Sequence, residues 1–197
     1  MKMVGIDLAG KMENPTGICV LEGFVIDLKT LYSDEEIIKT VKKNNPSLIA
    51  VDAPLSLPKS RCCLDKNCKC AMGGHFRQAE RDIQSYGRVL PLTFLGMKML
   101  TLRGIALATK LRKGYEVIET HPRTSQKILG FNDQNDLNLF FKFADGSTQH
   151  ELDATLAALT GFLYLKDCYI ELGDPEEGTI IIPRDERCLK WLKNPNY

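Results

Sequence analysis

Apolar and polar residues alternate along the N-terminal part of the chain with the two-residue period of β-strands. The pattern predicts strands over residues 2–8, 16–22 and 24–31, and the dipeptide EG between the last two is a hairpin signal. Strands that are joined by such short connections pair antiparallel. We therefore expect three antiparallel strands at the start of the protein.

The pattern then changes to a helix followed by a different kind of strand. Residues 34–44 have the features of a capped helix, because Ser33 precedes them, Glu36 follows three residues later and lysines fill the last turn. Residues 47–52 (SLIAVD) contain four consecutive apolar residues and end in Asp52, as expected of a strand that is covered on both faces. Since this strand follows a helix, it should run parallel to the first strand.

Similar periodicities divide the rest of the chain. They predict helices over 94–114, 122–130 and 150–167, strands over 115–120 and 178–183, and a final helical turn within 185–193. Residues 53–92 have no regular pattern apart from one candidate helix over 75–86. We therefore predict one domain of residues 1–197 with an α/β fold. Its mixed five-stranded sheet, three strands antiparallel and two parallel, is flanked by helices, and a Cys-rich insertion (53–92) follows strand 4.

Composition sets broad limits on function. Apolar residues make up 44% of the chain and charged residues 26%, which is usual for a soluble globular protein. No apolar run approaches the roughly 18 residues of a membrane span, and the N-terminus is unlike a signal peptide. We expect a cytoplasmic protein without a membrane partner.

The charge is unevenly distributed although the net charge is only +1. Residues 59–113 hold twelve Lys or Arg residues but three Asp or Glu residues. Such a basic segment fits a polyanionic partner such as nucleic acid. A solvated helix surface would give the same composition.

Three acidic residues stand at the ends of predicted strands: Asp7, Asp52 and Glu119. In open α/β sheets the carboxyl ends of parallel strands form the edge where ligands bind, and neighbouring strands lie about 4.8 Å apart. A fourth acid, Asp153, lies near the start of an apolar helix and shares a face with His150, three residues before it. Each acid alone could simply cap a backbone turn.

Several carboxylates side by side repel one another unless a cation neutralises them. Mg²⁺ and Mn²⁺ prefer oxygen ligands, and two such ions can clamp an in-line phosphoryl displacement. The pattern therefore favours metal-dependent cleavage of phosphodiester bonds. Asp7, Asp52 and Asp153 would be metal ligands, and Glu119 a ligand or a base.

Arginines and histidines near these acids are candidates for substrate contacts. Arg77 and Arg81 would share one face of the candidate helix over 75–86, and Arg123 follows Glu119 closely, so all three could bind phosphate. His121 and His150 could transfer protons. Exposed arginines that only aid solubility and histidines with structural roles are the alternatives.

Four cysteines lie within nine residues: Cys62, Cys63, Cys68 and Cys70. Four thiolates could hold a structural Zn²⁺, although their spacing differs from the usual pair of C-x-x-C motifs. Disulfides between them, or free thiols, are the other interpretations.

Four motifs together resemble a known family. "GIDLAG", "AVDAPLSLP", "GYEVIETHPR" and "HELDATLAALTGF" are similar to sequences of the domain of unknown function 429 family, described as predicted nucleases with a ribonuclease H-like fold. The resemblance extends over nearly the whole chain and implies catalytic acids at Asp7, Asp52 and Asp153, with Glu119 at the fifth-strand position. The cysteine run is not part of the family pattern.

The leading hypothesis is thus a Mg²⁺- or Mn²⁺-dependent nuclease acting on RNA or DNA. A catalytically silent module of the same fold that binds nucleic acid or nucleotide is the main alternative. Nucleotide phosphotransfer is a third, but the related kinases duplicate this fold and the chain has room for one copy. The sequence contains no P-loop and no G-x-S-x-G motif, and it does not indicate the oligomeric state.

Overall fold

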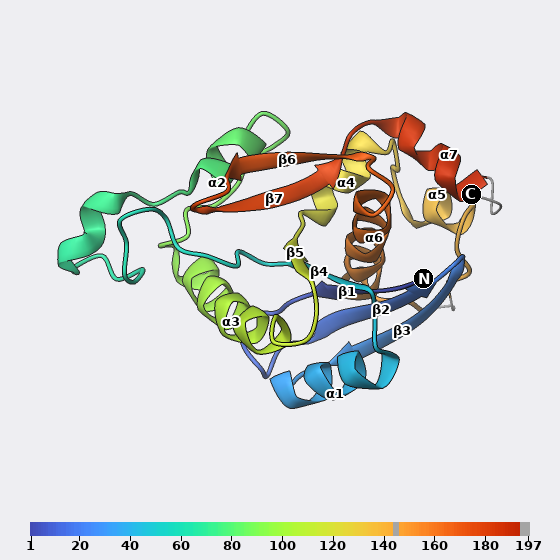
Figure 1. Ribbon diagram of the computed structural model, residues 1–197, viewed down its shortest axis with the longest axis horizontal. Coiled ribbons are helices and arrows are strands. Elements are labelled where there is room, and N and C mark those ends of the chain that lie inside the picture. The colour runs from blue at the N-terminus through green and yellow to red at the C-terminus, as the bar shows by residue number, and fades with distance from the viewer. Residues whose placement is uncertain (144–145, 194–197) are drawn as a thin grey trace.

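A five-stranded mixed sheet forms the centre of the computed structural model, which describes residues 1–143 and 146–193 (Figure 1). The strands lie in the order β3-β2-β1-β4-β5. The first three pair antiparallel, and β4 and β5 run parallel to β1. The predicted sheet is therefore confirmed. Its strands are β1 (Lys2–Asp7), β2 (Thr16–Glu22), β3 (Val25–Leu31), β4 (Leu48–Asp52) and β5 (Val117–Glu119).

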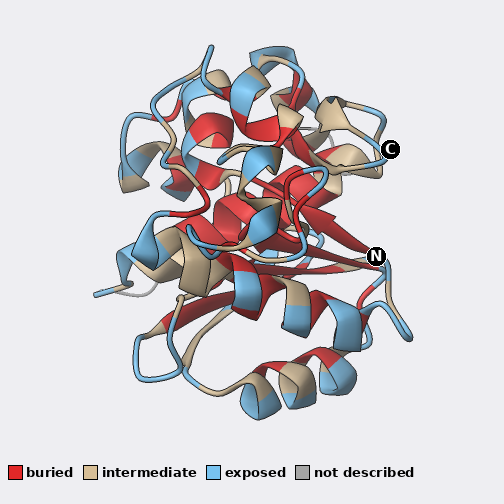
Figure 2. Cartoon of the chain, turned by 90° about the vertical axis from the view of Figure 1, so that its left-hand side faces the viewer, coloured by how far each residue is buried: buried red, intermediate tan, exposed pale blue. Residues whose placement is uncertain are grey.

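Helices cover both faces of this sheet. Helices α1 (Asp34–Asn44) and α3 (Leu95–Leu111) pack on the face that carries Ile6 and Val51, and α6 (Gln149–Tyr164) packs on the other face. Figure 2 shows the buried residues concentrated in the strands and in the helix sides turned toward them. The shorter helices α4 (Pro122–Ile128) and α5 (Gln134–Asn138) precede α6 in the chain. In the described part of the chain, no helix is long and apolar enough to cross a lipid bilayer.

The start of α1 follows the local signals in the sequence. The side chain of Ser33 accepts a hydrogen bond from the backbone N–H of Glu36 at 3.2 Å, and the Glu36 carboxylate accepts one from the backbone N–H of Ser33 at 2.9 Å. This reciprocal capping box satisfies backbone donors that would otherwise lack partners. The predicted helix over 34–44 is therefore confirmed at both ends.

The segment between β4 and α3 leaves the sheet. It contains the short helices η1 (Lys69–Gly73) and α2 (Gln78–Ile83) and extends beyond the rest of the molecule on the left of Figure 1. The cysteine cluster follows β4 as predicted. Helix α2 is shorter than the predicted 75–86.

A second sheet, of two strands, was predicted only in part. Strand β6 (Tyr169–Asp174) pairs antiparallel with β7 (Gly178–Pro183), whereas the sequence pattern predicted β7 alone. The hairpin packs against α2 through a small apolar cluster that includes Ile83 and Ile182. The helical turns predicted after it are η2 (Glu186–Leu189) and α7 (Lys190–Lys193).

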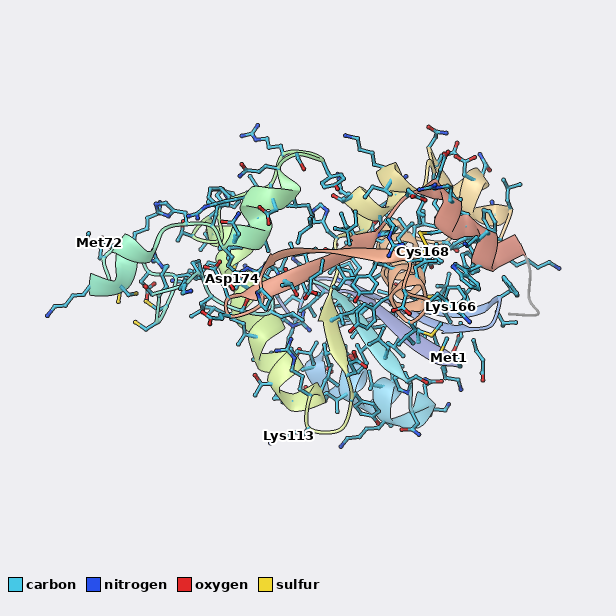
Figure 3. The ribbon with its side chains drawn as sticks, turned by 45° about the horizontal axis from the view of Figure 1, so that its top comes forward. Met1, Met72, Lys113, Lys166, Cys168 and Asp174 are labelled. Carbon is cyan, nitrogen blue, oxygen red and sulfur yellow. A yellow bond between two sulfur atoms is a disulfide. The ribbon has the colours of Figure 1, made fainter. Side chains whose placement is uncertain are left out.

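A disulfide joins Cys168, which precedes β6, to Cys188 in η2. This bond was not predicted, because only the clustered cysteines stood out in the sequence. The two partners are 20 residues apart in the chain, and the β6–β7 hairpin brings them together. Figure 3 shows Cys168 far from Met72, which lies at the outer end of the insertion.

Helix α6 lies so close to the sheet that only glycine fits beneath it at two positions. A Cβ atom added to Gly5 would lie 2.0 Å from the carbonyl oxygen of Ala154, and one added to Gly17 would lie 2.0 Å from the carbonyl oxygen of His150. Both obstacles are backbone atoms, so the helix itself would have to move. The two glycines therefore fix the distance between the sheet and the helix that carries Asp153.

We predict that Gly5→Ala lowers the free energy of unfolding by about 1–3 kcal/mol or more, because it overpacks a backbone contact. Chemical denaturation measures this change. Gly114→Ala is the matched control, since a Cβ atom there would meet nothing within 4 Å. Equal stability of the two variants would show that α6 can move away from the sheet without cost.

Candidate active site

Asp7 and Asp52 lie side by side at the carboxyl ends of β1 and β4. They are register partners in the parallel pair of these strands, so their side chains project from the same face of the sheet. Helix α6 covers this face, because Gly5, two residues before Asp7, lies beneath that helix. The register thus brings together two of the acids that the sequence analysis placed at one edge.

Helix α6 adds Asp153 and His150 to this edge. The Nδ1 atom of His150 lies 2.6 Å from Oδ2 of Asp7, within hydrogen-bond distance. The Oδ1 atom of Asp153 accepts a hydrogen bond from Nε2 of Gln149 at 3.0 Å. Asp153 is 7% exposed, whereas the side chain of His150 is 46% exposed. One turn of α6 therefore supplies a buried acid and an accessible imidazole.

Burial raises the pKa of Asp7, Asp52 and Asp153 above the ordinary value. The negative charges of Asp7 and Asp153 raise the pKa of Asp52 further, and the charge of Asp153 does the same for Asp7. Arg123 lowers the pKa of all three carboxyl groups, but it does not cancel the rise. The edge thus collects negative charge that the protein itself neutralises only in part.

These three carboxylates do not form a tight cluster. Among the residues that the structure describes, the four clustered cysteines are the only group of three or more potential ligand atoms that all lie within 4.8 Å of one another. The hydrogen bonds to His150 and Gln149 orient Asp7 and Asp153 separately.

Glu119 ends β5, but it projects from the opposite face of the sheet. Its register partner on β4 is Val51 and not Asp52, and successive side chains of a strand alternate between faces. The Oε2 atom of Glu119 accepts hydrogen bonds from Nη1 of Arg77 and from the backbone N–H of Leu55, both at 2.8 Å. These are the contacts of a residue that fixes the chain after β4, and they differ from the predicted role of ligand or base.

Arg77, predicted to bind phosphate, is fully buried. Its guanidinium group forms ion pairs with Glu80 and Glu119, and its Nη1 atom donates to Oγ of Ser56 at 2.7 Å. Arg77 precedes α2 and faces inward, whereas Arg81 is exposed. The two arginines therefore do not share an exposed helix face, and only Arg81 is accessible to a phosphate.

Arg123 and His121 lie at the start of α4 and differ in exposure. Arg123 is exposed. His121 caps α4, because its Nδ1 atom accepts a hydrogen bond from the backbone N–H of Thr124 at 3.3 Å. Burial lowers the pKa of His121, and the charge of Arg123 lowers it further. The predicted proton-transfer residue is thus a half-buried helix cap whose neutral form is favoured.

A cavity of about 330 Å³ opens beside Asp52. Thr120, which the sequence analysis did not consider, lines it and is 2% exposed. Within the described chain, its Oγ1 atom is the one buried side-chain polar atom without a hydrogen-bond partner. No sequence pattern indicates this role, because the register of β5 decides that Thr120, and not Glu119, falls level with Asp52. The other lining residues include His121, Arg123, Leu90, Met97, Leu100 and Ile180.

Part of the predicted basic surface lies inside the protein. Arg61, Arg77 and Arg103 are buried, and Arg103 pairs with Asp34 at 2.9 Å. Their charges therefore organise the fold and do not face a polyanion. Several other basic residues of the segment are exposed, among them Lys66, Lys69, Arg81 and Arg88.

The chain is similar in fold to a solved structure, T. thermophilus RuvC in complex with Holliday junction substrate. The match has a TM-score of 0.51 and 14% sequence identity, and it covers 85% of this chain and 96% of that chain. The fold is similar to that of RuvC. At this identity the likeness shows the fold alone, which is the ribonuclease H-like fold expected from the sequence.

No protein-family model matches the chain, and no curated protein does. Membership of the domain of unknown function 429 family thus stays a prediction. The RuvC-like fold nevertheless places Asp7 and Asp52 near α6, because it brings β1, β4 and α6 to one edge of the sheet.

Proposed function

We propose that the protein is a metal-dependent nuclease whose Asp7, Asp52 and Asp153 hold Mg²⁺ or Mn²⁺. The observation that carries this proposal is the register pairing of Asp7 with Asp52, on the face of the sheet where α6 supplies Asp153. The likeness in fold to a RuvC that was solved with a nucleic-acid substrate supports it.

The donor set suits such an ion. Carboxylate oxygens are the ligands that Mg²⁺ and Mn²⁺ prefer. Burial and mutual repulsion oppose ionisation of these three carboxyl groups, so a divalent cation would supply the charge that Arg123 supplies only in part. When bound, the ion would polarise the scissile phosphate and lower the pKa of bound water.

The residues next to the three acids would bind the substrate and orient the acidic side chains. Arg123 is exposed and acts electrostatically on all three acids, so its guanidinium group can contact the substrate phosphate beside them. His150 holds Asp7 and Gln149 holds Asp153. The partly apolar cavity beside Asp52 can receive a sugar or a base next to the cleaved bond.

The substrate class follows from charge and fold. Exposed Lys66, Lys69, Arg81 and Arg88 suit a nucleic-acid backbone. The RuvC structure contains a Holliday junction, so a four-way DNA junction belongs among the substrates to be tested, together with single-stranded and duplex DNA, RNA and the hybrid.

The test is cleavage of these labelled substrates with Mn²⁺, with Mg²⁺ and with EDTA. We expect products only with metal. Loss of a residue that only supports a metal ligand lowers metal affinity or activity about 10–100-fold. Because Asp7 is proposed as a ligand itself, Asp7→Asn should reduce cleavage by more than about 100-fold.

Asp27→Asn is the matched control, because Asp27 lies on β3 and is largely exposed. It should cleave like the wild type. Binding without cleavage, unchanged by Asp7→Asn, would contradict the proposal and favour a silent binding module.

A further inference from the structure

The four cysteines of the insertion converge on one point. The Sγ atoms of Cys62 and Cys68 lie 3.8 Å apart, and those of Cys63 and Cys70 lie 3.7 Å apart. All four Sγ atoms lie within 4.8 Å of one another. The sequence left three interpretations open for this cluster: a metal site, disulfides or free thiols.

The sulfur spacing distinguishes the first two. In a tetrahedral site with Zn–S bonds of about 2.3 Å, neighbouring sulfurs are about 3.8 Å apart, whereas a disulfide requires about 2.05 Å. The chain does contain a disulfide elsewhere, between Cys168 and Cys188. We propose that Cys62, Cys63, Cys68 and Cys70 bind one Zn²⁺ as a tetrahedral thiolate site, releasing the thiol protons on binding.

Arg61 holds the backbone around this site by hydrogen bonds. It is 7% exposed, and its guanidinium group donates hydrogen bonds to the carbonyl oxygens of Cys63, Asp65, Ala71 and Gly74 at 2.8–3.1 Å. Two of these carbonyls lie within the cysteine run, and two lie just after it. One buried side chain thus ties the two halves of the loop together and holds the thiols near one another.

The loop has almost no core of its own. Within residues 59–76 only Arg61 and Leu64 are buried, and Met72 at the outer end is 98% exposed. An ion pair between Asp65 and Lys98 connects the loop to α3. A segment with so little buried apolar surface needs a further cross-link to stay folded, and a structural Zn²⁺ supplies one.

The Zn²⁺ would also hold charged side chains in place. Strands β1 and β4 both run toward the side of the molecule from which the insertion extends (Figure 1). The loop carries exposed Lys66 and Lys69. The Zn²⁺ would fix the backbone that carries these two positive charges. The proposal itself stands whether or not the protein cleaves nucleic acid.

The experiment is metal analysis of the full chain purified under reducing conditions without chelator, combined with native mass spectrometry. We expect one zinc per chain. Replacement by Co²⁺ should give the visible absorption of tetrahedral thiolate coordination. Cys62→Ser and Cys70→Ser should each lower Zn²⁺ affinity more than the roughly 10–100-fold that loss of an outer-shell partner costs.

Cys19→Ala is the matched control, because Cys19 is a free cysteine buried in the main core. It should keep its zinc, and circular dichroism of all variants checks that they fold. A mass that shows two disulfides within the cluster would overturn the proposal. So would iron in place of zinc, four free thiols after incubation with Zn²⁺, or equal loss of zinc from Cys19→Ala.

Discussion

Replacing Arg77 with Met should lower the free energy of unfolding by about 3–5 kcal/mol, the usual cost of leaving buried charges without their partner. Glu80 and Glu119, which Arg77 binds, are only 4% and 5% exposed, and Arg77 itself is fully buried. Water cannot replace the lost guanidinium group there. Met has a similar length and no charge, so the change removes the ion pairs and leaves most of the packing.

The stability lost in Arg77→Met should depend on pH in a defined direction. Burial raises the pKa of Glu119, and Arg77 offsets part of this rise. Without Arg77 the pKa of Glu119 rises further. An acid whose pKa is raised by folding costs stability in full above the raised pKa, and this cost fades as the pH falls from the raised pKa to the ordinary one. The stability difference between wild type and Arg77→Met should therefore shrink toward acidic pH.

Urea denaturation at neutral and acidic pH measures both effects. Arg81→Met is the matched control, because Arg81 lies four residues later, within α2, and is exposed; it should change stability by less than about 0.5 kcal/mol. Neutralising both acidic partners as well, in the triple variant Arg77→Met/Glu80→Gln/Glu119→Gln, should restore much of the lost stability. If Arg77→Met proves as stable as Arg81→Met, the buried network does not support this part of the fold.

Asp52→Asn should lower metal-dependent cleavage by more than about 100-fold. It should also raise the unfolding temperature measured without metal. Burial raises the pKa of Asp52 well above its ordinary value, and the charges of Asp7 and Asp153 add to this effect. The ionised carboxylate is therefore unfavourable in the folded state at neutral pH. The neutral amide of Asn removes that cost.

The raised pKa of Asp52 makes the stability of the wild type depend on pH. The folded state binds its proton more tightly than the unfolded state, so wild-type stability falls as the pH rises from about 3.8, the ordinary pKa, through the raised pKa of Asp52. The advantage of Asp52→Asn should be absent near the lower value and full above the higher one.

Thermal unfolding in EDTA and in Mn²⁺ measures the change, because a ligand stabilises only the state that binds it. Mn²⁺ should raise the midpoint of the wild type and leave that of Asp52→Asn unchanged. Asp27→Asn should respond to Mn²⁺ like the wild type. A lower midpoint for Asp52→Asn in EDTA would mean that the carboxylate stabilises the fold and is not held there for function.

Local signals in the sequence predicted the sheet and the position of two of the acids. Ser33 and Glu36 form the capping box expected of α1, and the apolar run before Asp52 is the buried strand β4 beside β1. These features depend on neighbouring residues and on the periods of strands and helices, which can be read from one sequence.

Features that depend on register or on distant partners could not be predicted in this way. A shift of one residue in the pairing of β4 with β5 turns Glu119 to the other face and leaves Thr120 level with Asp52. Arg77 looked like an exposed helical residue, but its acidic partner Glu119 is 42 residues away in the chain. Strand β6 and the bond of Cys168 to Cys188 likewise depend on the second sheet.

The most direct test of a metal-dependent site at Asp7, Asp52 and Asp153 is a crystal soaked in Mn²⁺ with anomalous diffraction data. We predict an anomalous peak coordinated by the carboxylates of Asp7 and Asp52, which an Asp7→Asn crystal lacks. An empty acidic edge at Mn²⁺ concentrations that support cleavage, or a peak bound only by residues elsewhere in the chain, would contradict the proposed active site.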